Sequence, residues 1–273
     1  MTSGPGRGGG SPAPAGAVLA GLRLDVDGAV ATVTLSRPER RNAMTPAMWR
    51  GLAAIGESLP PGVRVVVVRG DGPSFSSGID VRLLSAEGTP DGERIADPAG
   101  PGFDEWLAGC QAGFLWLHRE DIVSIAAVRG HAIGAGFQLA LACDLRVLAE
   151  DATFCMKEPA LGLVPDLGGT KPLVDLVGLP RAVELCLTAR TVPAQEAREL
   201  RLAEIVVPAA ELDDCVADLV AALLATDAAA ARATKALLAQ APAHTVEQQA
   251  AAERAAQAAL QRARRGTQKA GPG

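Results

Sequence analysis

Two glycine-containing segments each follow a predicted buried strand and could aim backbone N–H groups at a ligand. The first spans residues 74–80 (SFSSGID) and the second spans residues 130–138 (GHAIGAGFQ). Glycine lets the chain turn sharply and lets a ligand approach the backbone closely. The first N–H groups of a helix lack internal partners and carry the positive end of the helix dipole. Two such groups that converge on one point would form an oxyanion hole, which stabilises negative charge developing on a carbonyl oxygen.

Three polar side chains near these segments are candidates for proton transfer or for orienting a reactant. Glu158 and Asp166 lie within residues 158–170 (EPALGLVPDLGGT), and Gln138 follows the second glycine turn. A carboxylate can act as a general base, whereas a glutamine amide does not titrate near neutral pH. Each residue also has a structural interpretation. Glu158 could pair with Lys157, Asp166 could cap the following helix, which is the favoured interpretation for that residue, and Gln138 could be a hydrogen-bonded spacer.

The composition predicts a folded, acidic protein. Hydrophobic residues make up 48% of the 273 positions and charged residues 21%, which suits one large domain, or one domain with a small appendage, and argues against bulk disorder. The net charge of −5 and the pI of about 5.3 do not suggest a nucleic-acid partner, which would need a basic face. An anionic ligand can still bind such a chain at helix N-termini and a local cationic group.

The cysteines indicate a reducing cytoplasm. They are odd in number, widely scattered and without a CxxC pair, so neither a disulfide framework nor a zinc site is expected: Cys110, Cys143, Cys155, Cys186 and Cys215. The longest apolar stretch, between Arg129 and Asp144, is too short and too rich in glycine to span a bilayer, which needs roughly 20 apolar residues. We therefore expect no membrane association.

Strands that alternate with helices predict an α/β layered fold. Strands are expected over 22–26 and 29–35, separated by the turn Asp27-Gly28, and over 63–68, 122–128, 145–148 and 203–207. The segment 63–68 is nearly all valine, and a strand that is apolar on both faces is typical of a buried parallel sheet.

Helices account for most of the remaining chain. The first begins at Thr45-Pro46, because a capping residue followed by proline is a common helix start. The others are expected over 106–117, 134–143, 168–177, 180–189, 193–201 and, as alanine-rich helix, 209–264. Residues 1–16 are predicted to form a flexible tail and residues 87–102 a mobile loop, since both are rich in glycine and proline.

Four segments, in this order and spacing, resemble the crotonase superfamily, whose type member is enoyl-CoA hydratase. Residues 37–44 (RPERRNAM) are similar to its RPxxxNAx signature, FSSGID and GHAIGAGFQLALACD to its two oxyanion segments, and GLVPDLGGT to its third segment. The resemblance covers about residues 22–262. It implies a spiral of ββα units over 17–208, a C-terminal α-helical trimerisation region over 209–264, and a homotrimer or hexamer. Residues 265–273 are expected to form a flexible end.

The same resemblance implies roles for individual residues. Ile79 and Ala135 match the oxyanion donors, each through its backbone N–H, and Arg82 would lie near a phosphate of coenzyme A. The substrate would be an acyl-CoA thioester, with no cofactor or metal ion beyond the CoA that the substrate itself carries. The implied CoA-binding residues are Arg41, Ser77, Ile79, Asp80, Val81, Arg82, Gly134 and Ala135.

Gln138 and Glu158 decide which reaction the resemblance favours. Hydratases of the family use two glutamates, and this chain has Gln138 at the first position and Glu158 at the second. One carboxylate at the second position resembles the Δ3,Δ2-enoyl-CoA isomerases, where a single glutamate moves a proton between C2 and C4. Asp166 is placed similarly to an aspartate that assists the glutamate in dienoyl-CoA isomerases, although PDLGGT also occurs in family members that resemble ordinary hydratases.

The leading prediction is therefore an enoyl-CoA isomerase with Glu158 as proton shuttle. One alternative is a hydratase in which Glu158 acts with a water held by Gln138. Another is a protein that binds acyl-CoA without turning it over. Thioester hydrolysis, decarboxylation and dehalogenation also use this kind of oxyanion hole and stay open. The sequence does not specify the acyl chain.

Overall fold

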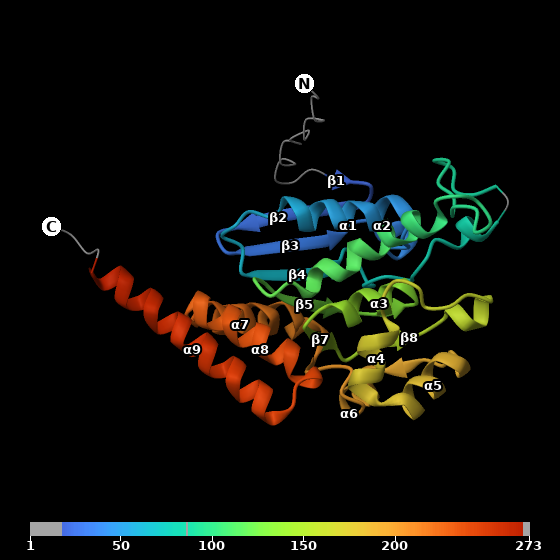
Figure 1. Cartoon of the computed structure of the whole chain (residues 1–273). Coiled ribbons are helices and arrows are strands. Elements are labelled where there is room, and N and C mark those ends of the chain that lie inside the picture. Colours follow the sequence, from blue (N-terminus) through green and yellow to red (C-terminus); the bar gives the residue numbers. More distant parts are fainter. Residues whose placement is uncertain (1–17, 86, 270–273) are drawn as a thin grey trace, which may run out of the picture.

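A seven-stranded sheet forms the centre of the protein in the computed structural model, which describes residues 18–85 and 87–269 (Figure 1). The first three strands are antiparallel neighbours, and every later pairing in this sheet is parallel. In spatial order the strands are β1 (Val18–Leu19), β2 (Leu22–Asp27), β3 (Val30–Leu35), β4 (Val65–Gly70), β5 (Val123–Val128), β7 (Leu145–Ala149) and β10 (Ile205–Val207).

Helices cover both faces of this sheet and form the C-terminal part of the chain (Figure 1). The α-helices are α1 (Pro46–Ser58), α2 (Phe103–Leu115), α3 (Ala135–Ala142), α4 (Thr170–Val177), α5 (Leu179–Thr188), α6 (Ala194–Glu199), α7 (Leu212–Leu224), α8 (Ala228–Gln240) and α9 (Val246–Lys269). Short 3-10 helices include η1 (Pro38–Arg40), η2 (Val81–Leu84), η3 (Trp116–His118) and η4 (Glu158–Leu161). None of the helices in the described part of the chain is long and apolar enough to cross a membrane.

The valine-rich strand β4 is buried on both faces, as its composition predicts. Val66 and Val68 belong to the main core, which α1, α2 and α3 help to form. Val65 and Val67 point to the opposite face, where they join a second cluster that includes residues of α7. Successive side chains of a strand point to opposite faces, so one strand contributes to both cores.

A second, three-stranded sheet positions the candidate site. Its strands are β6 (His131–Ile133), β8 (Thr153–Cys155) and β9 (Val192–Pro193). The chain passes along a long strand of the first sheet, then a short strand of the second, then a helix, as in β5–β6–α3 and β7–β8–η4. Two such turns stack in parallel, since β5 pairs with β7 and β6 pairs with β8.

The predicted long elements are present, with shifted ends. Helix α2 begins at Phe103 and ends at Leu115, where a helix over 106–117 was expected, because η3 continues the chain in a tighter turn. Residues 87–102 contain neither helix nor strand. The three strands of the second sheet are not among the predicted elements. Residues 1–16 lie outside the described residues, and α9 continues past residue 264 to Lys269, into the segment expected to be flexible.

Candidate active site

Two segments run in parallel and bring the two predicted backbone donors to equivalent positions. Ser76 pairs with Ala132 of β6 in an isolated parallel bridge. The backbone N–H and carbonyl of Ser76 hydrogen-bond the residues on either side of Ala132, at N···O distances of 2.7 and 3.0 Å. Ile79 lies three positions after Ser76, and Ala135 lies three positions after Ala132. Because the two segments are paired in parallel, Ile79 and Ala135 occupy equivalent positions along them.

A glycine with positive φ precedes each donor. The φ angle is +90° at Gly78 and +50° at Gly134, in the region that favours residues without a Cβ atom. A Cβ atom on Gly78 would lie 2.6 Å from the carbonyl oxygen of Ile133 and 3.7 Å from the amide nitrogen of Ala135. The first segment thus passes directly against the amide of the second donor, an approach that only glycine permits.

The amides of Ile79 and Ala135 make no hydrogen bond to another described residue. The amide before each donor is paired: that of Gly78 donates to Ser76 Oγ at 3.1 Å, and that of Gly134 donates to a backbone carbonyl of β8 at 2.8 Å. Both Ile79 and Ala135 line one cavity. Two unpaired N–H groups in one cavity wall are the donors that an oxyanion hole requires.

A buried asparagine fixes the first donor segment. Asn42 is fully buried, and its amide donates to two backbone carbonyls in the loop 71–74 at 2.9 and 2.8 Å. Its Oδ1 accepts from the backbone N–H of Arg37 at 2.9 Å. Its own carbonyl accepts from Ser76 Oγ, the atom that holds the amide of Gly78. The asparagine of the RPxxxNAx signature therefore positions the loop and does not touch the cavity.

Glu158 is a buried carboxylate in the wall of the same cavity. Its side chain is 7% exposed, at the start of η4, and Oε1 accepts from Gln138 Nε2 at 2.7 Å. Its Oε2 has no hydrogen-bond partner. Burial raises the pKa of this carboxyl, and the nearby charge of Asp166 also raises it, while the bond from Gln138 lowers it. Lys157 lines the cavity without pairing with Glu158, so the surface-pair interpretation of Glu158 is wrong.

Gln138 is locked between Glu158 and the backbone of the third segment. Its Oε1 accepts from the amides of Leu167 and Gly169 at 2.9 and 3.2 Å. Both acceptor sites of that oxygen are thereby used, which assigns Nε2 to the side that faces Glu158. The side chain is 1% exposed. Gln138 consequently orients the catalytic candidate and joins α3 to the segment before α4.

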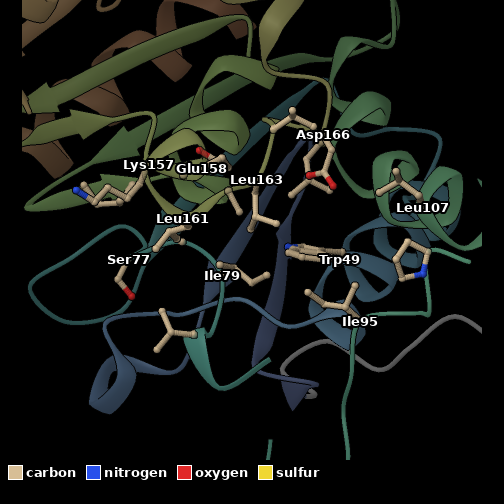
Figure 2. A pocket seen from close by; sticks show the side chains of 18 of the residues that line it. Trp49, Ser77, Ile79, Ile95, Leu107, Lys157, Glu158, Leu161, Leu163 and Asp166 are labelled. Carbon is tan, nitrogen blue, oxygen red and sulfur yellow. The ribbon is translucent and has the colours of Figure 1, made fainter. Parts of the chain in front are cut away.

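Asp166 lines the cavity and does not cap a helix. Helix α4 begins at Thr170, and the residue at its N-terminal cap is Gly169, so the favoured capping interpretation of Asp166 is wrong. The carboxylate faces the cavity in Figure 2. Burial among protein atoms raises the pKa of this carboxyl. The cavity thus contains two carboxylates whose proton affinities are both increased.

The cavity has a volume of about 410 Å³ and is lined mostly by apolar side chains. Its donor side is formed by Gly78, Ile79, Gly134 and Ala135, and its acidic side by Glu158 and Asp166. The opposite wall comes from α1, α2 and the irregular segment before α2, and includes Trp49, Ile95, Pro98, Phe103, Trp106 and Leu107. A few polar groups in an apolar cavity are typical of a small-molecule site.

The residues implied in CoA binding divide into two groups. Ser77 and Val81 line the cavity together with the donor glycines, whereas Arg41, Asp80 and Arg82 do not line it. The Arg82 side chain is engaged by Asp80, to which its Nε and Nη2 donate at 2.8 and 2.6 Å. This bonding lowers the pKa of Asp80 to about 2. The predicted contact between Arg82 and phosphate stays a prediction.

Trp49 is a lining residue that the sequence reasoning did not single out. It lies on α1 next to Met48, on the face of the helix that packs into the core. A tryptophan on an apolar helix face reads as an ordinary core residue, so no local signal marks it as part of a site. No cluster of three or more His, Cys, Asp or Glu side chains in the described residues could hold a metal ion.

Comparison with known proteins assigns the chain to a family. Residues 25–269 match the family model described as enoyl-CoA hydratase/isomerase. The chain is 30% identical over 205 residues to a hydroxycinnamoyl-CoA hydratase-lyase of Pseudomonas fluorescens, covering 74% of this chain and 72% of that protein. It is 32% identical over 188 residues to a peroxisomal Δ3,5-Δ2,4-dienoyl-CoA isomerase of Arabidopsis thaliana, covering 66% of each.

Solved structures agree with this assignment. A Thermobifida fusca protein proposed to be an enoyl-CoA hydratase was solved with CoA, and it matches 88% of this chain with 63% identity and a TM-score of 0.85, over 93% of its own length. The acetoacetyl-CoA complex from the same organism matches 90% of this chain with 60% identity and a TM-score of 0.87, over 98% of its length. The chain therefore belongs to the enoyl-CoA hydratase/isomerase family of the crotonase superfamily.

Proposed function

We propose that the protein is an enoyl-CoA isomerase that moves a double bond between C3 and C2 of an acyl-CoA thioester. The observation that carries the proposal is the unpartnered Oε2 of buried Glu158, which lies in the same cavity as the unpaired amides of Ile79 and Ala135. An acceptor for a proton and two donors for an oxyanion are the groups needed to form and quench an enolate.

In the proposed reaction Glu158 moves one proton and the backbone amides hold the charge. Oε2 takes a proton from C2 of a 3-enoyl thioester, and the electron pair passes through the carbonyl carbon to the thioester oxygen. The N–H groups of Ile79 and Ala135 donate to that oxygen. The protonated Glu158 then returns the proton to C4, and the double bond ends between C2 and C3. The raised pKa of Glu158 makes the carboxylate a stronger base than an exposed one.

The bonding of Gln138 favours isomerisation over hydration. Its Oε1 is already occupied by the amides of Leu167 and Gly169, so it offers no free acceptor to a water molecule. Its Nε2 donates to Glu158 Oε1, which directs the reactive lone pairs to Oε2. A hydratase would have to activate water with Glu158 alone.

A dienoyl-CoA isomerase is a second candidate, supported by Asp166. That carboxylate shares the cavity with Glu158 and raises its pKa, and one of the relatives is named a dienoyl-CoA isomerase. Two carboxylates would let protons leave and enter at more distant carbons. The CoA and acetoacetyl-CoA complexes of the Thermobifida fusca protein support an acyl-CoA ligand in either case.

Incubation with 2-enoyl-, 3-enoyl- and 3,5-dienoyl-CoA in heavy water tests the proposal. We expect conversion of the 3-enoyl substrate to the 2-enoyl product, with deuterium at C2 and C4 and no net hydration. Formation of 3-hydroxyacyl-CoA would support the hydratase instead. Conversion of the dienoyl substrate that is lost in Asp166→Asn would support the second candidate. Recovery of every substrate without label would identify a binding protein.

A further inference from the structure

The indole N–H of Trp49, a residue that lines the cavity, is a buried donor without a partner among the described residues. The side chain is only 4% exposed, and its Nε1 makes no hydrogen bond among the described residues. Figure 2 shows the indole beside the cavity, with the ring nitrogen at the end nearer to Ile79. Buried tryptophans usually pair this N–H, because leaving a desolvated donor unpaired costs free energy.

Few buried side-chain atoms in the described residues lack a partner, and their places in the fold differ. They are Thr34 Oγ1, Trp49 Nε1, Trp116 Nε1 and Glu158 Oε2. Of their residues, Trp49 and Glu158 line the cavity, whereas Thr34 and Trp116 do not. Glu158 Oε2 has a proposed role in the reaction. The Trp49 N–H is then the other unpaired side-chain atom on a residue that lines the cavity, and the proposed reaction does not use it.

The surroundings of Trp49 specify what could accept this hydrogen bond. Ile95, Phe103 and Leu107, which line the same cavity, provide no acceptor from their side chains. A plain alkyl chain would displace water and leave the N–H unpaired. A carboxylate on the acyl group would be repelled by Glu158 and Asp166. A hydroxyl group is neutral, accepts from an N–H, and can donate its own proton to a carboxylate such as Asp166.

We propose that the preferred acyl group carries a hydroxyl that accepts a hydrogen bond from Trp49 Nε1. This inference rests on the proposed function, which seats the thioester oxygen at Ile79 and Ala135 and the reacting carbons C2 to C4 at Glu158. The hydroxyl therefore belongs on the chain beyond C4. The substrate class is a distally hydroxylated acyl-CoA, and Trp49 is the residue that distinguishes it from the plain alkyl thioester.

Calorimetric titration with octanoyl-CoA and its 5-, 6- and 7-hydroxy derivatives tests the proposal. We expect at least one hydroxylated ligand to bind the unmodified protein about 3- to 10-fold more tightly than octanoyl-CoA, the gain of a single neutral hydrogen bond. Trp49→Phe should still bind octanoyl-CoA, but it should bind the hydroxylated ligand no more tightly than octanoyl-CoA. Trp116→Phe is the matched control, because it removes another unpaired indole N–H that does not line the cavity, and it should keep the ratio.

A spectroscopic measurement covers the case in which Trp49→Phe does not fold. The chain has three tryptophans, so three indole N–H signals can be assigned by nuclear magnetic resonance. We expect the Trp49 signal to move downfield with the preferred hydroxylated ligand and not with octanoyl-CoA. The inference would be overturned if the Kd ratio between octanoyl-CoA and the hydroxylated ligand were the same in all variants, or if no hydroxylated ligand bound more tightly. Either result would leave the proposed function intact. Failure of octanoyl-CoA itself to bind would overturn both.

Discussion

At the scale of single residues, Glu158 is kept reactive at a cost in stability. A buried carboxylate with one unpartnered oxygen is less stable in its charged form than the same group in water. Gln138 offsets part of this cost by donating to Oε1, whereas the buried Oε2 has no hydrogen-bond partner. Selection for stability alone would have paired or removed this charge.

Replacing Glu158 with glutamine should abolish proton transfer and preserve ligand binding. The amide has nearly the same shape and can still accept from Gln138, but it has no basic oxygen. We expect kcat for 3-enoyl-CoA to fall about 10²- to 10⁴-fold, the usual contribution of a general base. The Kd for acyl-CoA by calorimetry should stay within about threefold, since the oxyanion donors are unchanged. Glu57→Gln, at an exposed position on α1, is the control and should retain full activity.

Activity should rise with pH through the raised pKa of Glu158. The ionised carboxylate is the active form, and burial shifts its protonation to a pH above the ordinary value of 4.5. A profile of kcat/KM against pH for 3-enoyl-CoA should therefore show its acidic limb above that value. A limb at or below the ordinary carboxyl range would contradict the assignment of Glu158 as base.

The raised pKa of Glu158 also predicts that the stability of the fold, unlike the activity, falls as pH rises. Because the native state holds the Glu158 proton more tightly than the unfolded state does, stability falls as pH rises from 4.5 through the raised native pKa. Glu158→Gln has no ionisable carboxyl at this position, so it lacks this pH-dependent contribution to stability. Urea unfolding should show the variant to be more stable than the unmodified protein at neutral pH, and the difference should shrink as the pH is lowered toward 4.5.

At the scale of elements, the site depends on two turns that present one amide each. The parallel register between Ser76 and β6 places the two amides at equivalent positions. The glycines before Ile79 and Ala135 turn the backbone and so orient these amides. The oxyanion donors exist as a pair only because the two turns are hydrogen-bonded to each other.

Gly78→Ala should disable the donor pair. The substitution adds a Cβ 2.6 Å from the carbonyl of Ile133 and forces a residue with a side chain into φ near +90°. We expect kcat/KM to fall about 10²- to 10³-fold, as when one oxyanion donor is lost. Gly28→Ala is the control, because Gly28 also has positive φ but has open space around it, in the β2–β3 turn. Similar activity loss in both variants would indicate that backbone strain, not the donor geometry, is responsible.

Lys235 should be an anchor for α8. Its Nζ donates to the carbonyls of Arg119 and Ile122 and to Asp144 Oδ2, each at 2.7 Å, although no residue of α8 is fully buried. Lys235→Met should lower the free energy of unfolding by about 1–3 kcal/mol, the usual cost of removing a charged hydrogen-bond donor. Lys171→Met, which breaks an exposed ion pair with Asp175 on α4, should change it by less than about 1 kcal/mol. Urea titration of both variants measures the difference.

At the scale of the whole molecule, the C-terminal helices are incompletely covered. Helix α9 packs against α8, and its C-terminal end projects beyond the other C-terminal helices (Figure 1). Leu238 of α8 is 67% exposed and Val246 of α9 is 81% exposed. Apolar side chains on an uncovered helical arm are a common feature of subunit contacts.

We therefore propose that the protein is a homotrimer or a hexamer, in which this arm contacts neighbouring subunits. Light scattering after size exclusion should give three or six times the chain mass of 27.9 kDa. Removal of residues 246–273 should reduce the assembly to a smaller species. A mass equal to one chain for the intact protein would contradict this proposal.

Much of the architecture could be predicted from the sequence because its signals are local. Alternating or continuous apolar runs predicted the strands of the large sheet, and Thr45-Pro46 predicted the start of α1. The second sheet escaped prediction because its strands contain only two or three residues, too few to show a period. Asp166 was misjudged because the capping rule applies to a residue next to a helix, and α4 begins four positions later.

By itself, the sequence identified the family and several residues of the cavity wall, among them Ile79, Ala135 and Glu158. Four segments in order identified the superfamily, and Gln138 in place of a carboxylate narrowed the possible chemistry. Only the tertiary structure brought Trp49 into the cavity and aimed the amide of Gln138 at Glu158. Exposure and hydrogen bonding depend on neighbours distant in the chain, so residue type and spacing cannot specify them.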